Sequence, residues 1–446
     1  MPWVSDENAP AFVDLYELTM AASYFARGMN EPATFELSVR RLPPNRGFLV
    51  ACGLEDAVAY LDGFAFGDDA IDYLRSLGAF DGAFLDALAR LRFTGDVWAV
   101  PEGEAVFGQE PILRVTAPLI EAQLVETFLL SAVSFQTMIA TKAARIALAC
   151  GDRAFVDFSG RRDHGADAAL KVARASCVGG ASATSNVLAG QLYGLEVSGT
   201  MAHSYVLAFP DEADAFRAYT RDFPQGAVLL IDTYDTVEGA RRAAAVANEL
   251  RAEGVAIRGV RLDSGDLATL ALAVRDVLDA EGCADLRIFA SSDLDEYRIA
   301  DLLAQGAPID AFGVGTRLGT SADAPSLVAV YKLVDGARGP VMKHSPDKAS
   351  HPGVKQVYRE ERNGASLGDT IALAGETGVA GRPLLERVMA SGERLGAPES
   401  LAVLRDRRAT AVARLPETAR RLKADADAYP VRLSPGLATL IEELGG

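Results

Sequence analysis

Short apolar runs alternate with helical patterns through the middle of the chain. Five runs have the length of buried strands: AFVDF (154–158), AVLLIDTY (227–234), AIRGVRLDS (256–264), LRIFASS (286–292) and IDAFGVG (309–315). Apolar residues at helical spacing fill the intervals between the last four runs. Because strands that alternate with helices in this way form right-handed βα units, the pattern predicts a parallel sheet buried on both faces.

The two ends of the chain have a different, strand-rich pattern. Near the N-terminus the sequence predicts strands at 34–43, 47–55, 95–100 and 111–119, the first two joined by the turn PPNR. After residue 325, the runs SLVAVYKLV and KQVYRE predict two further strands. Strand-rich ends on both sides of a βα core indicate one accessory domain assembled from both ends of the chain.

Two helical patterns complete the predicted organisation. Residues 120–150 repeat apolar positions over several turns and predict a long, largely buried helix. Residues 398–425 are helical in pattern but charged, which favours a solvated helix. We therefore predict three segments: the N-terminal part of the β-rich domain (1–120), the βα core with the active site (121–325), and the C-terminal part of the β-rich domain with a helical tail (326–446).

Composition and charge narrow the class of protein. The net charge of -17 argues against nucleic-acid binding, and an anionic substrate would need a local cluster of basic side chains. The four cysteines form no CxxC pair, which fits a reducing compartment and indicates neither a zinc site nor a disulfide framework. No signal peptide or long uncharged apolar stretch is visible. We expect a cytoplasmic protein with no membrane span.

Polar residues follow each predicted strand of the core. They are Asp157, Asp232, Asp263 with Asp266, Ser291 with Ser292, and Gly315 with Thr316. The carboxyl ends of parallel strands meet at one edge of a sheet, and that edge carries the active site in open sheets and barrels alike. Five polar strand ends in succession therefore predict a shared site.

The segment GVRLDSGDL (259–267) carries the densest group of charges at such a strand end. Asp263 and Asp266 are spaced to act together on a hard cation such as magnesium, or to position a hydroxylated substrate. A turn with a helix cap is the alternative, and it explains Asp266 well. It does not explain Arg261, because an arginine on a buried strand needs an anionic partner.

Two further loops have the chemistry of anion sites. In DFSGRRDHG (157–165), Arg161 and Arg162 suit bidentate contacts to phosphate or carboxylate, although either could instead pair with a neighbouring aspartate. In FGVGTRL (312–318), Gly315 and Thr316 offer backbone N–H groups and a hydroxyl to a phosphate. The motif alone is weak evidence, but it follows the last strand of the βα series, where barrels often bind phosphate.

The segments SGTMAHSY (198–205) and KHSPDKASHPG (343–353) hold three of the four histidines. His203 lies among small residues, where a ligand can approach closely. His344 and His351 lie with Lys343 and Lys348 in a predicted basic loop that could cover a polyanion. From these residues alone, we infer a βα-barrel enzyme that acts on a sugar phosphate with a metal.

The motifs taken together resemble nicotinate phosphoribosyltransferase. DLYELTMAASYF (14–25) and FELSVRRLPPNRGFLVACGLE (35–55) match it, as do the four site segments at 157–165, 198–205, 259–267 and 312–318, in order along the chain. The resemblance implies a type II phosphoribosyltransferase-like fold, an irregular βα barrel with an accessory β-rich α/β domain from both chain ends. It also implies a homodimer with the active site at the interface.

The same resemblance implies a reaction. The family forms nicotinate mononucleotide from nicotinate and 5-phosphoribosyl 1-pyrophosphate in NAD salvage, with Mg²⁺ and with ATP as co-substrate. By the resemblance, His203 accepts the phosphoryl group of ATP, while Tyr16, Thr200 and Arg261 contact nicotinate. Tyr16 suits stacking on the pyridine ring, and Arg261 suits its carboxylate.

The remaining site residues follow from the same match. Gly315 and Thr316 correspond to the loop that contacts the phosphoribosyl substrate, and Arg161 with Arg162 to an anion-binding loop. Asp263 is expected to stabilise positive charge on the sugar or to hold Mg²⁺ with Asp266. The chain departs from the family pattern at Val13, before DLY, and at ASSDLDE (290–296), where relatives often carry glycine or asparagine.

Three other functions compete with this one. A nicotinamide phosphoribosyltransferase would need to accept a neutral amide, for which a carboxylate-binding arginine matters less. A non-catalytic sensor of nicotinate or of the nucleotide would not need His203, Thr200, Arg261 and Thr316 together. Quinolinate phosphoribosyltransferase shares the architecture but needs a more basic pocket for its diacid.

Overall fold

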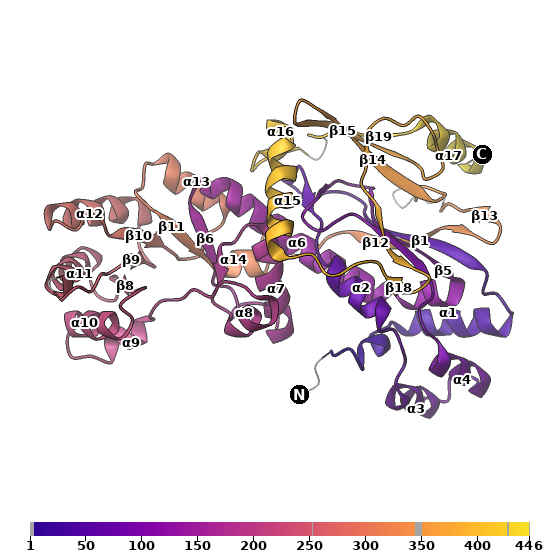
Figure 1. Ribbon diagram of the computed structural model, residues 1–446, viewed down its shortest axis with the longest axis horizontal. Coiled ribbons are helices and arrows are strands. Elements are labelled where there is room, and N and C mark those ends of the chain that lie inside the picture. The colour runs from indigo at the N-terminus through magenta and orange to yellow at the C-terminus, as the bar shows by residue number, and fades with distance from the viewer. Residues whose placement is uncertain (1–3, 252, 344–349, 426–427, 446) are drawn as a thin grey trace. The chain divides into compact units, whose positions relative to one another are not determined.

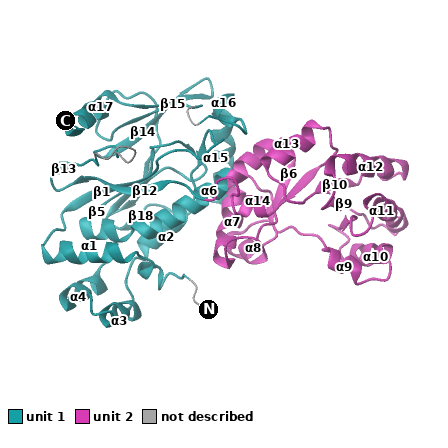
Figure 2. Ribbon diagram, turned by 180° about the vertical axis from the view of Figure 1, so that it is seen from behind, with its two compact units in different colours: residues 1–141, 326–446 teal, residues 142–325 magenta. Residues whose placement is uncertain are grey.

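The computed structural model describes residues 4–251, 253–343, 350–425 and 428–445. The chain divides into two compact units: unit 1 comprises Met1–Thr141 and Ser326–Gly446, and unit 2 comprises Lys142–Pro325 (Figure 2). The boundary between them falls within helix α6 (Glu126–Cys150). Within the described residues, no helix is long and apolar enough to cross a membrane.

Unit 2 is built on a six-stranded parallel sheet, as the alternating pattern predicts. In spatial order its strands are β7 (Ala183–Thr184), β6 (Ala154–Asp157), β11 (Ala311–Val314), β10 (Arg287–Ala290), β9 (Gly259–Leu262) and β8 (Val228–Leu230). Most of their side chains are buried because helices cover the sheet, which accounts for the continuous apolar runs. Within the part of the chain that the structure describes, the two edge strands, β7 and β8, do not pair with each other, so the sheet is an open part of a barrel and not a closed one.

Helices connect these strands and flank the sheet (Figure 1). They are α7 (Ala166–Gly179), α8 (Val187–Tyr193), α9 (His203–Leu207), α10 (Glu212–Asp222), α11 (Thr236–Arg251), α12 (Leu267–Ala280), α13 (Glu296–Ala304) and α14 (Thr316–Gly319). Helix α11 packs closely on the sheet because a Cβ at Gly239 would lie 2.1 Å from the carbonyl oxygen of Ile231. The predicted βα units 227–315 are thus confirmed.

Unit 1 is organised around a seven-stranded sheet drawn from both ends of the chain. Its strand order is β13 (Gly339–Pro340), β12 (Ala329–Gly336), β1 (Pro32–Val39), β5 (Pro111–Pro118), β3 (Asp96–Ala99), β17 (Glu386–Ala390) and β18 (Glu393–Arg394). Strand β1 pairs antiparallel with β12, so that Leu37 faces Tyr331 across nearly three hundred residues of sequence. The prediction that both ends build one β-rich region is confirmed.

Two smaller sheets complete the β structure of unit 1. One has the order β16 (Arg382–Pro383), β14 (Lys355–Arg362), β15 (Ala365–Leu373) and β19 (Val431–Leu433), and the other pairs β2 (Leu49–Val50) with β4 (Ala105–Val106). The helices of this unit are η1 (Ala9–Ala11), α1 (Leu15–Ala26), α2 (Leu54–Asp62), α3 (Asp68–Ser76), α4 (Gly82–Arg90), α5 (Leu119–Leu124), α15 (Leu401–Arg414), α16 (Glu417–Arg420) and α17 (Pro435–Gly445).

The predicted strand at 47–55 is largely wrong. Only Leu49 and Val50 are extended, and they pair with β4, because both edges of β1 are already used by β12 and β5. At Gly53 the backbone turns with φ of 97° and packs against the α6 backbone, and α2 begins at the next residue. The turn PPNR therefore does not join two paired strands.

The charged tail is helical but not simply solvated. Helix α15 buries Leu404, Ala411 and Val412 against unit 1. A Cβ at Gly103 would lie 2.5 Å from the carbonyl oxygen of Leu404, so the two backbones meet closely. The segment contains so many charged residues that its composition does not reveal the apolar face that packs on the rest of unit 1.

A buried carboxyl in unit 1 makes stability depend on pH. Glu17 is 0% exposed; the Thr127 hydroxyl donates to its Oε1 at 2.5 Å, and its Oε2 has no partner among the described residues. Burial raises the pKa of Glu17 from 4.5 to about 7. Between these two values the folded state holds a proton that the unfolded state has lost, so this group lowers stability as pH rises.

We expect Glu17→Gln to reverse that loss. Relative to wild type, the variant should gain about 3 kcal/mol in free energy of unfolding between pH 4.5 and pH 8, because an amide cannot ionise. Urea unfolding at both pH values measures the difference. The exposed Glu7→Gln is the control and should show no such swing; a Glu17→Gln difference that is constant with pH would contradict the prediction.

Candidate active site

Two interlocked carboxylates lie at the carboxyl edge of the unit 2 sheet. Asp232 follows β8, and its Oδ2 accepts hydrogen bonds from the backbone N–H of Asp263 (2.9 Å) and the hydroxyl of Ser264 (2.6 Å). Asp263 follows β9, and its Oδ1 accepts a hydrogen bond from Ser291 at the end of β10. The other oxygen of Asp232 is buried without a partner among the described residues. Three neighbouring strand ends thus form one anionic group.

His203 lies beside this group. It is the first residue of α9, and its Nδ1 is 3.1 Å from the hydroxyl of Thr233. Its Nε2 lies 3.9 Å from Oδ2 of Asp263, too far for a hydrogen bond, and the side chain is 40% exposed. An imidazole held through one nitrogen, with the other open, is placed to act as a nucleophile.

Arg261 projects from β9 at the same edge. Its Nη1 donates a hydrogen bond to the hydroxyl of Thr200, in the loop before α9. Its Nε is buried and has no partner among the described residues. Burial lowers the pKa of Arg261, which still remains a cation, while Asp263 and Asp232 nearby act in the opposite direction. A buried guanidinium with an unused N–H fits the carboxylate of a ligand.

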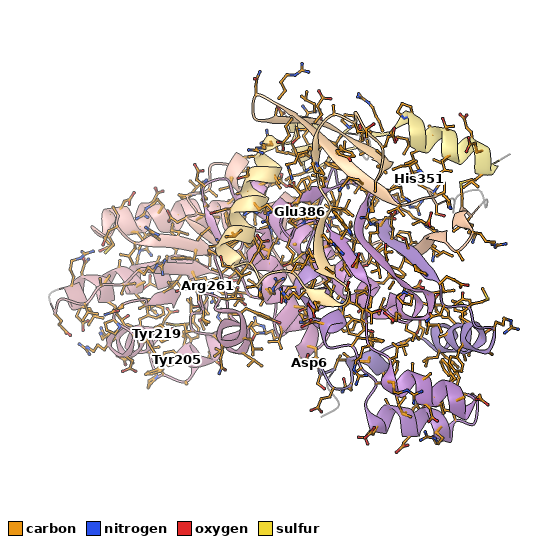
Figure 3. All side chains as sticks on the ribbon, turned by 45° about the vertical axis from the view of Figure 1, so that its right-hand side comes forward. Asp6, Tyr205, Tyr219, Arg261, His351 and Glu386 are labelled. Atoms are coloured by element: carbon orange, nitrogen blue, oxygen red, sulfur yellow. The ribbon has the colours of Figure 1, made fainter. Side chains whose placement is uncertain are left out.

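An aromatic pair from α9 and α10 includes one neighbour of Arg261. The rings of Tyr205 and Tyr219 are 5.6 Å apart in an edge-to-face arrangement. Tyr219 is close enough to Arg261 for each to shift the pKa of the other. Figure 3 labels all three residues. Neither tyrosine is predicted from sequence, and nor is Thr233. Thr233 could have been predicted because its hydroxyl directly follows Asp232 in the sequence. The two tyrosines could not, because they come together only when α9 packs against α10.

The loop after β6 is fixed by a hydrogen-bonded core. Asp157 accepts hydrogen bonds from the backbone and hydroxyl of Ser159 (2.9 and 2.5 Å) and from the hydroxyl of Thr184 (2.8 Å). Burial, with the nearby charge of Asp157, raises the pKa of Asp163 to about 6. A Cβ at Gly319 would lie 1.8 Å from Asp163, so only glycine fits there.

Arg161 and Arg162 are exposed in this loop. Burial is the main cause of the lowered pKa of Arg261, and the charge of Arg161 is near enough to add to it. The backbone N–H of Arg162 donates to the carbonyl of Ser159 at 2.6 Å. The structure therefore gives Arg161 the closer relation to the edge that holds Arg261.

Gly315 and Thr316 follow β11, beside β10 and β6. Gly315 precedes α14 with φ of -112° and ψ of -114°, and Thr316 is the first residue of that helix. At the end of β10, Ser292 and Asp293 have φ of 102° and 45°, which are positions that favour glycine or asparagine. The bidentate pair of Asp293 with Arg317 (2.9 Å) accompanies this strained turn.

The carboxylates at this edge suit magnesium unequally. Within the described residues, no three His, Cys, Asp or Glu side chains are grouped to hold a metal. Asp266 is the N-cap residue of α12, the position that the capping alternative anticipates, and its carboxylate accepts a hydrogen bond from the Thr269 hydroxyl at 2.6 Å. The orphaned oxygen of Asp232 and the exposed oxygen of Asp263 fit a magnesium ion that is otherwise held by phosphate and water.

Tyr16 belongs to unit 1, in the first turn of α1, and is 46% exposed. Its phenol shares a hydrogen bond with the carboxylate of Glu126, and burial, with that glutamate, raises the pKa of Tyr16. An exposed ring whose hydroxyl is held at one end is suited to stacking on a planar ligand.

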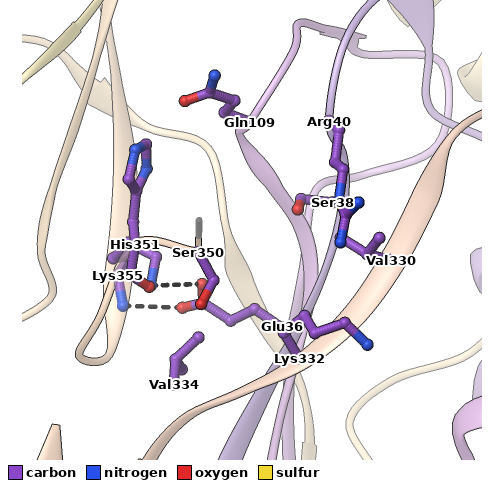
Figure 4. Close-up of a pocket in the computed structure, with 10 residues that line it drawn as sticks. All are labelled: Glu36, Ser38, Arg40, Gln109, Val330, Lys332, Val334, Ser350, His351 and Lys355. Atoms are coloured by element: carbon purple, nitrogen blue, oxygen red, sulfur yellow. Dashed lines mark hydrogen bonds and ion pairs between the residues drawn. The ribbon is translucent and has the colours of Figure 1, made fainter. Parts of the chain in front are cut away.

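Unit 1 also contains a cavity of about 350 Å³ lined by basic side chains (Figure 4). The lining includes Arg40, Lys332, Lys355 and the single carboxylate of Glu36, which is 2.9 Å from Lys355 Nζ. The excess of cations fits an anionic ligand.

His351 lines the same cavity, but it adds no charge at neutral pH. Burial and nearby Lys355 lower the pKa of His351 to about 4, contrary to the basic role expected from sequence. Lys343 is described, whereas His344 and Lys348 lie outside the described residues.

Comparison with known proteins consistently gives one family. A family model for the nicotinate phosphoribosyltransferase (NAPRTase) N-terminal domain matches residues 12–134. The chain is 47% identical over 425 residues to nicotinate phosphoribosyltransferase pncB2 of Mycobacterium tuberculosis, covering 95% of this chain and 91% of that protein. It is 47% identical over 381 residues to nicotinate phosphoribosyltransferase of Bacillus subtilis, covering 83% and 77%. The crystal structure of human nicotinic acid phosphoribosyltransferase superposes with a TM-score of 0.87 at 32% identity, covering 97% of this chain and 99% of the other.

A parallel half-barrel with polar strand ends, joined to antiparallel sheets from both chain ends, defines a type II phosphoribosyltransferase fold. The chain belongs to the nicotinate phosphoribosyltransferase family, and it is an enzyme with that activity in NAD salvage. The resemblance, the fold class and the enzyme class expected from sequence are confirmed.

Proposed function

We propose that the chain forms nicotinate mononucleotide and pyrophosphate from nicotinate and 5-phosphoribosyl 1-pyrophosphate, coupled to ATP hydrolysis through phosphorylated His203. The observation that carries the choice of nicotinate is Arg261, whose buried Nε–H has no partner among the described residues. A carboxylate satisfies this group and its charge, whereas the amide of nicotinamide offers one neutral acceptor and brings two further donors.

Arg261 and Thr200 would hold the carboxylate of nicotinate, with Tyr219 at the side of the guanidinium. Tyr16 would stack on the pyridine ring, as the resemblance implies. The ring nitrogen then forms a bond to C1 of the ribose while the bond from C1 to the pyrophosphate oxygen breaks, and its electron pair leaves with pyrophosphate. Positive charge develops on the sugar, and Asp263 lies at the strand end where it would stabilise that charge.

His203 supplies the coupling. With its proton on Nδ1, donated to Thr233 at 3.1 Å, the imidazole keeps a lone pair on Nε2. That lone pair forms a bond to the γ-phosphorus of ATP, and the bond from phosphorus to the bridging oxygen breaks with ADP as the leaving group. Water later takes the phosphoryl group as inorganic phosphate. The open side of Nε2, toward Asp263, leaves space for this transfer.

The phosphates of both substrates need cationic and N–H contacts in an acidic protein. In unit 2, Arg161, Arg162, Gly315 and Thr316 would provide them, and in unit 1 the cavity lined by Arg40 and Lys332 would be a separate phosphate contact. When bound with the phosphates, magnesium would neutralise the leaving pyrophosphate, held by Asp263 with Asp232 or Asp266. As the resemblance implies, the working form would be a cytoplasmic homodimer with its active site at the interface.

Product formation tests this proposal directly. Wild-type enzyme with 5-phosphoribosyl 1-pyrophosphate and magnesium receives nicotinate or nicotinamide, each with and without ATP, and nucleotide is quantified by chromatography. We expect nicotinate mononucleotide, accelerated by ATP, and at least about a hundredfold preference over nicotinamide. Reaction of nicotinamide alone would overturn the role of Arg261, and ligand binding without either reaction would indicate a sensor.

A further inference from the structure

Glu126 occupies a central place in unit 1 that the reaction outlined above does not use. It is the first residue of α6, and its side chain is about 10% exposed. Its carboxylate accepts a hydrogen bond from the Tyr16 phenol and another from Nε2 of Gln123 at 3.0 Å. Because the donors come from α1 and α5, the carboxylate joins three helices at one point.

The same carboxylate contacts a side chain that lines the cationic cavity. Lys332 Nζ lies 3.8 Å from Oε1 of Glu126 and also donates to the carbonyl of Tyr331 at 2.9 Å. Lys332 is one of the basic side chains that line that cavity. Glu126 therefore contacts the residue proposed to stack on nicotinate on one side and a residue proposed to face phosphate on the other.

We propose that Glu126 is a positioning residue that couples Tyr16 to Lys332, and through them couples nicotinate binding to binding of the phosphorylated substrate. This inference rests on the proposed function of Tyr16 and of the cavity. A phenol that donates to a carboxylate makes a short, directional bond, which fixes where the exposed ring lies. Burial raises the pKa of Glu126, and the charge of Lys332 at 3.8 Å acts in the opposite direction, so a change at Lys332 alters the carboxylate beside the phenol.

Glu126→Ala should raise the KM for nicotinate about tenfold and change kcat less than about threefold, because the ring loses its anchor but no reacting group is removed. Glu126→Gln keeps an acceptor for the phenol and should recover most of that loss. Glu121→Gln is the matched control: this carboxylate is also buried, on α5, but it accepts from Thr94 (2.7 Å) and should leave both KM values unchanged.

Coupling is measured with Lys332→Met in two backgrounds. In otherwise wild-type enzyme it should raise the KM for 5-phosphoribosyl 1-pyrophosphate and also raise the KM for nicotinate about threefold. In the Glu126→Gln background, the effect on nicotinate should vanish while the effect on the phosphorylated substrate remains. An equal effect on nicotinate in both backgrounds, or an unchanged KM in Glu126→Ala, would overturn the inference.

Tyr16→Ala separates this inference from the function on which it rests. If it raises the KM for nicotinate while Glu126→Ala does not, only the coupling through Glu126 is wrong. If Tyr16→Ala leaves that KM unchanged, Tyr16 does not bind nicotinate, and the assignment of Tyr16 and the coupling both fail.

Discussion

His203→Ala is expected to remove the acceleration by ATP completely, lowering the rate of nicotinate mononucleotide formation about a hundredfold under conditions where ATP stimulates the wild type. The variant loses the nucleophile that carries the phosphoryl group, while Asp263 and Arg261 remain in place to bind and orient substrates. The residual rate without ATP should therefore fall by much less. Steady-state rates with and without ATP give both values.

Transfer of labelled γ-phosphate from ATP to the protein provides the direct measurement. Wild type should acquire an acid-labile label, and His203→Ala should acquire none. The exposed His164→Ala, in the loop after β6, is the matched histidine control and should be labelled like wild type. Labelling of His203→Ala at the wild-type level would place the phosphorylated residue elsewhere.

Substitution of Arg261 should have the second large effect, on choice of substrate. Arg261→Met removes the buried guanidinium, so the carboxylate of nicotinate loses its charge partner; we expect the KM for nicotinate to rise about a hundredfold. Arg261→Lys keeps the charge but loses the planar pair of donors, and its KM should fall between the two. The preference for nicotinate over nicotinamide should shrink in the same order.

Competition between the two pyridines in one reaction measures this preference as a ratio of kcat/KM values. Arg287→Met is a suitable control because this arginine lies on the neighbouring strand β10 with an exposed side chain. Its ratio should equal that of wild type. A wild-type preference for nicotinate in Arg261→Met would show that another group recognises the carboxylate.

Local signals account for the parts of this structure that could be predicted. The βα series is visible because each buried strand is a continuous apolar run and each site carboxylate, such as Asp232 or Asp263, directly follows one. His203 stands out because its sequence neighbours are small. These features need no knowledge of which strands pair.

The remaining features depend on contacts between distant segments. The hydrogen bond of His203 to Thr233 requires the loop before α9 to reach the end of β8, and Tyr219 reaches Arg261 only through the packing of α10. The failed strand at 47–55 has the same cause, because β12, almost three hundred residues later, takes the edge of β1 that a hairpin would use. The prediction of a basic role for His351 is wrong because its pKa depends on burial that its sequence neighbours do not reveal.

The turn at Ser292 and Asp293 has a consequence for how the enzyme would respond to selection. Both residues hold left-handed conformations that glycine adopts without cost, so the native sequence is not the most stable one at this place. A directed-evolution campaign that rewards heat resistance alone would accept glycine at position 292. A campaign that rewards turnover would retain Ser292 only if the stiffer backbone at position 292 holds the hydrogen bond from Ser291 to Asp263. The residue found at position 292 would then differ between selection for stability and selection for activity.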